Sequence, residues 1–267
     1  MNINKSDITV IIPAYNCQNT ILKTIKSINC QKDSQYISEI IIVNDGSTDN
    51  TRAVIESILS TNPIKIRLIN TNNGGVSKAR NNGLTLAKTR WIALCDSDDE
   101  WNKDKIARQV NLINSYSNID FLGGNHVPKT QRFLLRKLSK LTRISVNFLC
   151  LKTLPQTSTA IFKKSIFDEI GGYDESQSYA EDGNYFMKIA AKYNVYYDPE
   201  QVVVYGAGKA EYGESGLSSN VKAMHLGILK NISEMSRLGY ISFFYMLFSM
   251  IFECIKYNIR LIKLKLR

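Results

Sequence analysis

Four consecutive residues, Asp96-Ser97-Asp98-Asp99, follow an apolar run and carry three carboxylates within one turn. Carboxylate oxygens are the ligands that hard cations such as Mg²⁺ and Mn²⁺ prefer, and these cations also bind phosphate oxygens. Two carboxylates one residue apart at a strand end can address one ion, or the molecule beside it. The same acidic turn would also cap a helix that begins near Lys103. The spacing alone gives the metal site and the helix cap equal weight.

A second acidic pair, Glu181-Asp182, opens the segment EDGNYFMKIAAKY. Phe186, Ile189 and Ala190 recur there at helical spacing, which predicts a helix. Acids at a helix N-terminus are stabilised by the helix dipole, so the pair has a sufficient structural explanation. The preceding loop, Gly171–Asp174, offers backbone N–H groups to a substrate. By itself the pattern favours the structural explanation over catalysis.

A third feature is the segment GGVSKAR at residues 74–80, which leads from a turn into a helix. A helix N-terminus with Lys78 and Arg80 nearby suits an anion. The alternative is a plain turn with solvated charges. Neither GxGxxG nor GxxxxGK[ST] follows the first strand, which argues against a dinucleotide-binding fold and a Walker-type fold.

The elements that must position these residues alternate between strand and helix. In chain order they are expected at Ile8–Ile12, Ile21–Ile28, Glu39–Val43, Asp49–Leu59, Lys65–Ile69, Val76–Ala87 and Trp91–Cys95. This alternation predicts an α/β fold, a mostly parallel Rossmann-like sheet with helices on both faces. The four strands are followed by the polar turns 13–16, 44–47, 72–75 and 96–99. In an open α/β sheet such turns lie at the carboxyl edge, where ligands bind, so they should converge on one crevice.

The pattern changes beyond residue 100. The expected elements are a helix at 104–116, a strand at 121–127, a basic amphipathic segment at 131–150, a strand at 158–162, a helix at 183–193, short strands at 195–197 and 202–205, a Gly-rich loop at 206–217 and two C-terminal helices. We therefore predict one domain at 1–218, with halves of about 1–100 and 101–218, and a C-terminal helical element at 219–267.

The net charge of +10 is concentrated in two segments. Residues 129–152 carry seven Lys or Arg and residues 254–267 carry five, with no acid in either, and the rest of the chain has 22 basic and 24 acidic residues. This distribution favours an anionic membrane surface over nucleic acid as a partner. The five cysteines form no CxxC pair, which is typical of reduced core thiols in a cytosolic protein. The N-terminus shows no secretory signal pattern.

Two segments are expected to contact the membrane without crossing it. The apolar run Ile241–Ile255 has 15 residues, short of the ~20 that span a bilayer. Beyond it an apolar stripe lies beside a basic one at helical spacing, as in helices that lie in the membrane interface. The stripes are Ile255, Ile259, Ile262 and Leu266 against Lys256, Arg260, Lys263 and Arg267. Residues 131–148 are expected to repeat this with Leu134, Leu138, Leu141 and Phe148 against Arg132, Arg136, Lys140 and Arg143. The alternative is a helix packed on the domain with solvated charges.

Five motifs follow one another along the chain: VIIPAYN (10–16), IIIVNDGSTDNT (40–51), NGGVSKARNNG (73–83), LCDSDDEW (94–101) and GGYDE with AEDGNYFMKIA (171–190). In this order they closely resemble the motifs of the inverting family 2 glycosyltransferases. Each is weak alone, but the five together are specific, and the resemblance covers about residues 7–205. It implies a GT-A fold, with a nucleotide-sugar half at 1–100 and an acceptor half at 101–218. It also implies transfer of a sugar from a nucleotide diphosphate sugar, with a UDP-sugar as the favoured donor. The acceptor would be a lipid-linked glycan in the synthesis of a bacterial O-antigen, capsule or exopolysaccharide. The enzyme would work at the inner face of the cell membrane.

The resemblance also implies roles for individual residues. Pro13, Ala14 and Tyr15 would line the base and ribose, and Arg80 would lie beside the nucleotide. Asp45 would accept a hydrogen bond from the base, which suits the N3–H of uracil. Asp96 would face the ribose or donor sugar, and Asp98, with Asp96 beside it, would hold Mn²⁺ or Mg²⁺. Asp182 would be the general base, with Glu181 next to it.

One departure concerns a histidine that many relatives carry in a segment like HxxSxS, where it helps to hold the metal and diphosphate. The matching stretch here, Tyr212–Ser219, has none, so the third metal-side contact is open. His225 lies within an expected helix, where a structural role is favoured. His126 follows the Gly123-Gly124 strand end and could face the acceptor.

Two rival functions share these features. A Mg²⁺-dependent nucleotidyltransferase also pairs carboxylates with a nucleotide crevice, but it would release pyrophosphate. A membrane-bound scaffold with the same fold would show no turnover, although the intact acids at 96–99 and Asp182 argue against it. The donor sugar, acceptor, linkage and oligomeric state are not determined by the sequence.

Overall fold

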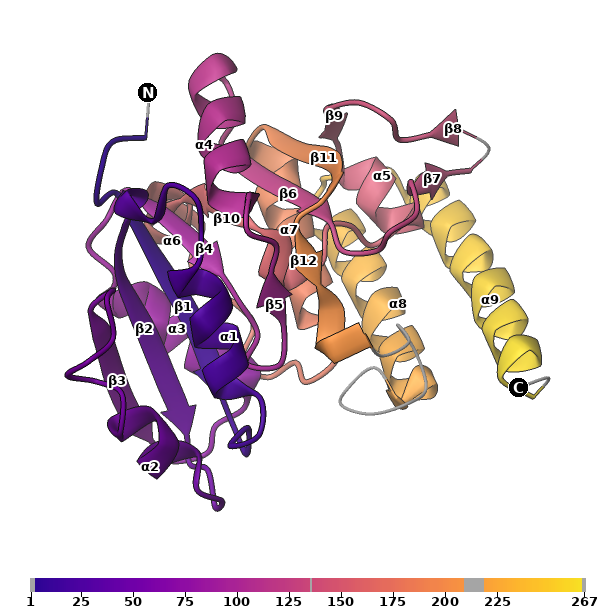
Figure 1. Ribbon diagram of the computed structural model, residues 1–267. Coiled ribbons are helices and arrows are strands. Elements are labelled where there is room, and N and C mark those ends of the chain that lie inside the picture. The colour runs from indigo at the N-terminus through magenta and orange to yellow at the C-terminus, as the bar shows by residue number, and fades with distance from the viewer. Residues whose placement is uncertain (1–2, 135, 209–218, 266–267) are drawn as a thin grey trace.

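A computed structural model describes residues 3–134, 136–208 and 219–265 of the chain. Within these residues one eight-stranded sheet crosses the molecule, and helices lie against both of its faces (Figure 1). Across the sheet the order is β3 (Ile66–Thr71), β2 (Ile37–Asp45), β1 (Ile8–Ala14), β4 (Trp91–Leu94), β10 (Ile161–Lys163), β6 (Phe121–Asn125), β11 (Val195–Gln201) and β9 (Thr142–Ile144).

The first half of the sheet is parallel throughout. β1 pairs with β2 and β4, and β2 pairs with β3, each time in parallel. β10 is antiparallel to both of its neighbours, β11 is parallel to β6, and β9 is antiparallel to β11. The predicted mostly parallel α/β sheet is confirmed. Its consequence for the site is that β1, β2, β3 and β4 end at one edge.

The helices are α1 (Ile21–Asn29), α2 (Thr51–Glu56), α3 (Val76–Leu86), α4 (Lys105–Ser115), α5 (Val146–Leu151), α6 (Lys164–Ile170), α7 (Glu181–Lys192), α8 (Val221–Arg237) and α9 (Phe243–Lys265). Side chains of a strand alternate between faces, and β1 shows the result. Its Val10 and Ile12 join the core under α1 and α4, whereas Ile11 joins the core under α3, α7 and α8. Both faces of the sheet are therefore covered, which explains why its strands are apolar almost throughout.

The prediction of a basic amphipathic helix-like segment at 131–148 is wrong. The described residues form a hairpin of β7 (Arg132–Phe133) and β8 (Arg136–Lys137), then strand β9, then the short helix α5. Leu138 and Phe148 are buried in the core, whereas Leu134 is exposed, so the apolar side chains share no common face. The physical reason is the open edge of β11, which takes up residues 142–144 through antiparallel pairing.

Several predicted boundaries are also corrected. α2 is shorter than the expected 49–59 at both ends: the Asp49 carboxylate accepts from the N–H of Thr51, where the helix begins, and the N–H groups of Ile58 and Leu59 bond three residues back instead of four. The expected strand at 158–162 begins only at Ile161, since residues 157–159 form the 3₁₀ turn η2. β12 (Val203–Val204) pairs with the short β5 (Glu100–Trp101), and η1 (Ser34–Tyr36) and η3 (Tyr205–Gly208) are further 3₁₀ turns.

The two expected C-terminal helices are present. α8 packs Ile228, Ile232 and Met235 into the main core, and α9 lies along the outer side of α8 and α5 (Figure 1). None of the described helices combines the length and the apolar character that crossing a bilayer requires. The C-terminal region is thus packed on the domain through α8, with α9 as the outermost helix.

Candidate active site

Polar turns meet at the carboxyl edge of the parallel strands. The Asn16 N–H donates to Ser47 Oγ at 3.0 Å, and the Thr48 N–H donates to Asn16 Oδ1 at 2.8 Å. These contacts join the turns after β1 and β2, and Asp45 joins the latter to the turn after β3. The predicted convergence of the strand ends at one edge is therefore present.

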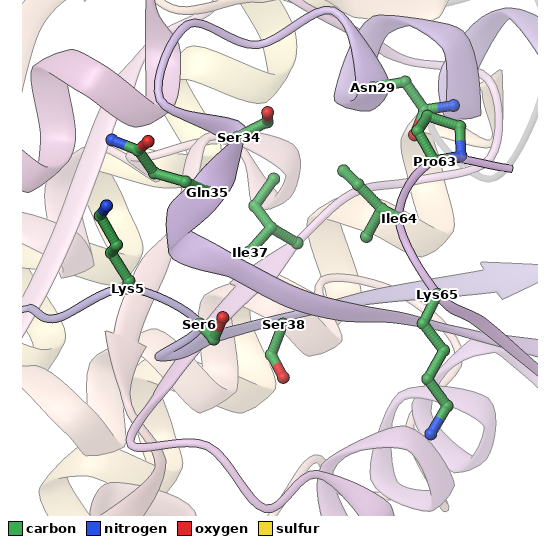
Figure 2. A pocket seen from close by; sticks show the side chains of 10 residues that line it. All are labelled: Lys5, Ser6, Asn29, Ser34, Gln35, Ile37, Ser38, Pro63, Ile64 and Lys65. Atoms are coloured by element: carbon green, nitrogen blue, oxygen red, sulfur yellow. The ribbon is translucent and has the colours of Figure 1, made fainter.

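A depression of about 440 Å³ lies elsewhere, at the amino ends of β1, β2 and β3 (Figure 2). Lys5, Ser6, Ser38 and Lys65 are among the side chains that line it, and no carboxylate lines it. Because it is at the opposite edge of the sheet from the acidic turns, we do not assign the chemistry to it.

The three residues expected to line the base and ribose differ in what they present. Pro13 and Ala14 are buried within β1, whereas Tyr15 is 51% exposed just beyond the strand. An exposed aromatic ring at a strand end can stack on a planar base. Of the three, only Tyr15 offers its side chain to a ligand, and the other two can offer backbone.

Asp45, the last residue of β2, organises the turn after β3. Its two carboxylate oxygens accept hydrogen bonds from the N–H groups of Gly74 and Gly75, at 2.9 and 2.8 Å. The next residue, Gly46, has φ of +69°, and a Cβ added there would lie only 2.6 Å from the backbone nitrogen of Asn73. Both facts favour glycine at this position. Asp45 is only 3% exposed. Since each of its oxygens already accepts one hydrogen bond, a base would have to donate to a second lone pair on one of them.

Arg80 of α3 joins two acidic clusters that are far apart in sequence. Its guanidinium donates to Asp96 Oδ1 at 2.8 Å and to Glu181 Oε1 at 2.9 Å, and it lies over the Tyr173 ring. The side chain is 4% exposed. Burial alone would lower the pKa of Arg80, but Asp96, Tyr173 and Glu181 raise it well above the ordinary value. The two terminal nitrogens donate to protein acids, whereas the buried Nε has no hydrogen-bond partner among the described groups, so Arg80 is placed to position Asp96 and Glu181.

The acids of the turn after β4, here called the DSDD turn (Asp96–Asp99), have unequal surroundings. Asp96 and Asp98 are partly exposed. Asp99 is fully buried and accepts from Ser158 Oγ at 2.5 Å, Gln156 Nε2 at 2.8 Å and the Gly206 N–H at 2.6 Å. Burial, reinforced by Asp96, raises the pKa of Asp99 to about 7. Asp99 therefore ties three chain segments together, whereas Asp96 and Asp98 keep part of their surface in contact with solvent.

The two acids at the start of α7 also differ in burial and in partners. Glu181 is 7% exposed and paired with Arg80, whereas Asp182 is partly exposed. Asp182 accepts from the Gly183 N–H at 2.6 Å and from Thr157 Oγ1 at 3.3 Å. Burial is the main cause that raises the pKa of both carboxyl groups. A nearby acid also raises each pKa: Asp182 acts on Glu181, and Asp96 acts on Asp182. A raised pKa keeps a carboxylate more basic, which suits proton abstraction.

Asn231 of α8 supports this acidic pair and was missed from the sequence. Its Nδ2 donates to the Ala180 carbonyl at 2.8 Å, and its Oδ1 accepts from Gln177 and Asn184. Ala180 has φ of +56°, a costly conformation for a residue with a side chain. The network holds that conformation in place. A polar asparagine on the apolar face of an amphipathic helix was the available signal.

The two histidines lie in different surroundings. His126 follows β6, and its ring centroid is 5.9 Å from that of Tyr205. His225 is buried in α8 and stacks on Tyr257 of α9, with centroids 4.2 Å apart. The stretch that lacks the expected histidine, at 212–219, lies outside the described residues except for Ser219.

Within the described part of the chain, no cluster of three or more His, Cys, Asp or Glu side chains could hold a metal ion. Asp98 and Asp96 are nevertheless hard oxygen ligands on an open turn. A cation there would need further oxygens from outside the described protein groups, such as those of a diphosphate. The donor set thus fits an ion that arrives with a nucleotide better than a structural metal.

Comparison with known proteins gives matches over most of the chain. Residues 9–171 match the model of glycosyl transferase family 2. An uncharacterized glycosyltransferase of Rickettsia prowazekii is 30% identical over 76% of this chain and 64% of its own length. WfaP of Escherichia coli, a UDP-Glc:alpha-D-GlcNAc-diphosphoundecaprenol beta-1,3-glucosyltransferase, is 40% identical over 42% of this chain and 45% of its own length. The chain spans only 37% of an uncharacterized glycosyltransferase of Rickettsia felis.

Solved structures show the same fold. S. aureus TarS 1-349 in complex with UDP-GlcNAc has a TM-score of 0.65 at 21% identity, over 84% of this chain and 66% of that one. The mannosyltransferase PcManGT of Pyrobaculum calidifontis, in complex with GDP-Man and Mn²⁺, has a TM-score of 0.68 at 20% identity, over 88% and 65%. The predicted GT-A fold is confirmed by these likenesses.

Proposed function

The chain belongs to glycosyl transferase family 2, and from that premise we propose that it transfers a sugar from a UDP-sugar to a hydroxyl of a lipid-linked glycan. The observation that carries the proposal is the bridge made by Arg80, which contacts Asp96 of the DSDD turn and Glu181 of α7. A donor held at the turn and an acceptor held beside α7 would meet at this bridge. Two acidic clusters brought together in this way suit a displacement between two substrates.

The nucleotide would lie along the carboxyl edge of β1 and β2. Tyr15 is exposed there for stacking, and Asp45 retains lone pairs for the N3–H of uracil. UDP is supported by WfaP, which is named as a UDP-Glc-dependent glucosyltransferase, and by the TarS complexes with UDP and UDP-GlcNAc. Pro13 and Ala14 would contribute backbone, since their side chains are buried. In this proposal Arg80 acts on the nucleotide side through Asp96, which it orients.

Asp98, with Asp96 beside it, would hold Mn²⁺ or Mg²⁺ together with the diphosphate. The ion would supply Lewis-acid stabilisation of the departing diphosphate. Both carboxylates are partly exposed, and PcManGT is described with Mn²⁺. Asp99 has no share in this role, because the protein already occupies its oxygens.

Asp182 would take the proton of the acceptor hydroxyl, with Glu181 held next to it by Arg80. Thr157 and the Gly183 N–H fix the Asp182 carboxylate, and its raised pKa makes it a better base than an ordinary aspartate. A single displacement inverts the anomeric centre, so an α-linked donor would give a β-linkage. The sugar transferred would be a hexose, as for WfaP, which is named a glucosyltransferase.

The acceptor would be a lipid-linked glycan of bacterial surface polysaccharide synthesis, as the names of WfaP and WfgD suggest. We propose that the chain meets it at the inner face of the cell membrane, as a peripheral protein on an anionic surface. The catalytic domain would span residues 1–218, with a nucleotide-sugar half and an acceptor half divided near residue 100. Residues 219–267 would form the membrane-associating element, although α8 also buttresses the acidic pair through Asn231.

Product analysis tests the proposal against its rivals. The purified chain is incubated with single nucleotide sugars and Mn²⁺ and without acceptor, and the released phosphates are separated. We expect slow release of UDP from one UDP-sugar, no pyrophosphate, and loss of release in EDTA. Pyrophosphate release would instead identify a nucleotidyltransferase. No turnover with any donor, including in the presence of membrane extracts that contain lipid-linked glycans, would favour the inactive scaffold.

A further inference from the structure

Helix α9 presents a row of large apolar side chains to solvent. They are 40–82% exposed: Phe243, Phe244, Leu247, Phe248, Ile251, Ile255, Ile259 and Ile262. At 3.6 residues per turn, most of these positions fall on one face of the helix. We call the set of Phe244, Phe248, Ile251, Ile255, Ile259 and Ile262 the apolar stripe. A continuous exposed stripe of this kind marks an interaction site on a soluble protein.

Buried polar contacts fix the rotation of α9, so the stripe faces outward. Ser249 and Glu253 lie on the opposite side of the helix and are fully buried. The Glu253 carboxylate accepts hydrogen bonds from Lys256 and Arg260, and Lys256 also donates to the Leu151 carbonyl at 2.9 Å. These contacts correct the expectation that both cations face outward beside the stripe.

The β7–β8 hairpin continues the surface made by α9. Helix α5 connects the two, since the Phe133 ring stacks on Phe148 at 4.0 Å and Tyr245 of α9 donates to the Asn147 carbonyl at 2.8 Å. The hairpin and the start of α9 lie on the side of the molecule away from β1–β3 (Figure 1). Arg132, Leu134, Arg136 and Lys137 of the hairpin are exposed. Both basic segments of the sequence therefore lie next to α5, since Lys256 of α9 also contacts its last residue, Leu151.

The charges on this face select its partner. Lys263 and Lys265 are exposed at the end of α9, and residues 254–267 contain no acid. A second copy related by a two-fold axis would bring like charges together. An anionic lipid surface complements both the apolar stripe and the cations around it. With no described helix able to cross a bilayer, α9 fits the interface plane.

We infer that the apolar stripe of α9 and the basic β7–β8 hairpin form one docking surface for an anionic lipid bilayer. The stripe enters the headgroup region, while Arg132, Arg136 and Lys137 lie against the lipid phosphates. This deepens the membrane contact included in the proposed function, which supplies its purpose. The docking itself requires no turnover and can be measured without a donor.

Co-sedimentation with phosphatidylcholine vesicles, with and without phosphatidylglycerol, tests the surface in two parts. The variant F248Q/I251Q/I255Q should bind both kinds of vesicle more than about tenfold less tightly at every salt concentration, because it removes apolar burial. The variant R136Q/K137Q should lose about tenfold on phosphatidylglycerol vesicles only, and the loss should shrink as salt rises. The two variants separate the apolar from the electrostatic contribution.

Matched controls come from α1, on the other side of the molecule. Leu22 is 45% exposed, and Lys23 and Lys26 are exposed. K23Q/K26Q removes as many cations as R136Q/K137Q, and L22Q replaces one exposed apolar side chain, to be compared with I251Q alone; both controls should bind vesicles like the wild type. Circular dichroism confirms that each variant is folded. Equal losses of vesicle affinity in the α1 and α9 variants would contradict the inferred docking surface.

Light scattering separates the lipid surface from a second copy. A wild-type dimer that ignores vesicles, and that F248Q/I251Q/I255Q converts to monomer, would also overturn the inference. Release of UDP is followed in the same samples. Vesicle binding as expected in a chain that releases no UDP would sustain the docking surface while removing the proposed function.

Discussion

The DSDD turn and the start of α7 each place acids next to one another, and in both clusters the neighbours have different environments. In the turn, Asp99 is fully buried and hydrogen-bonded by three groups, whereas Asp98 is partly exposed. At α7, Glu181 is buried against Arg80, whereas Asp182 is partly exposed. Each cluster thus has one buried acid that is held by other chain segments and one that is partly exposed.

The difference is that Asp99 is anchored by neutral donors, whereas Glu181 is anchored by a charge. Asp99 receives hydroxyl, amide and backbone hydrogen bonds, while Glu181 receives a buried guanidinium that it shares with Asp96. A buried ion pair that loses one partner leaves an uncompensated charge, which costs more than a lost neutral hydrogen bond. Sequence adjacency therefore says little about which acid is structural.

Asp182→Asn should produce the largest change in activity. Removing a positioned general base lowers kcat by about 10²–10⁴-fold, because the amide cannot accept the proton. Steady-state kinetics with donor and acceptor measures this, and UDP affinity should stay near that of the wild type. Because burial raises the pKa of Asp182, wild-type kcat should rise with pH through a limb above the ordinary aspartate range, since only the carboxylate is active.

The matched variant is Glu181→Gln, which keeps a hydrogen-bond acceptor for Arg80. It should lower kcat less than Asp182→Asn does. A near wild-type kcat for Asp182→Asn, or a larger loss of kcat in Glu181→Gln than in Asp182→Asn, would show that Asp182 is not the general base.

Arg80→Met should destabilise the fold by about 3–5 kcal/mol, because it leaves the buried Glu181 without its counter-charge. The free energy of unfolding in urea measures the loss. Arg52 provides the control, since its ion pair with Glu56 is exposed on both sides and Arg52→Met should cost at most about 1 kcal/mol. Equal losses for the two variants would remove the distinction between the buried bridge and a surface pair.

Asp99→Asn should cost about 1–3 kcal/mol of stability, because Ser158 and Gln156 donate to one carboxylate oxygen and the Gly206 N–H donates to the other, and the new amide has only one oxygen that can accept. Urea unfolding again gives the value, and Asp98→Asn serves as the comparison with little expected loss. If Asp98→Asn destabilised the fold as much as Asp99→Asn, the division of labour within the turn would be wrong.

Asp98→Asn should weaken metal-supported UDP binding by at least about tenfold, since loss of even an outer-shell partner of a metal typically costs about 10–100-fold. Calorimetry with UDP in Mn²⁺ and in EDTA measures it, and only the Mn²⁺ value should change. Asp104, with an exposed side chain, provides the control substitution Asp104→Asn. Wild-type UDP affinity that is the same in EDTA and in Mn²⁺ would contradict a metal at Asp98.

Much of the fold followed from the sequence, because strand and helix periodicity are local properties. The alternation of the first hundred residues predicted the parallel half of the sheet, and with it the edge where the turns at 13–16, 44–47, 72–75 and 96–99 lie. The helix that opens with Glu181 and the two C-terminal helices were also expected, and α7, α8 and α9 are present. A local pattern failed at residues 142–144, because the open edge of β11 takes them into the sheet.

Only the tertiary structure decided which groups share a buried environment. Arg80 contacts Asp96 and Glu181, which are 16 and 101 residues away, and no spacing rule links them. Asn231 supports Ala180 from 51 residues further along the chain. A charged or polar group that folding removes from water must find a partner wherever the chain brings one within hydrogen-bond distance. That partner depends on the packing of whole elements, which the residue types alone do not specify.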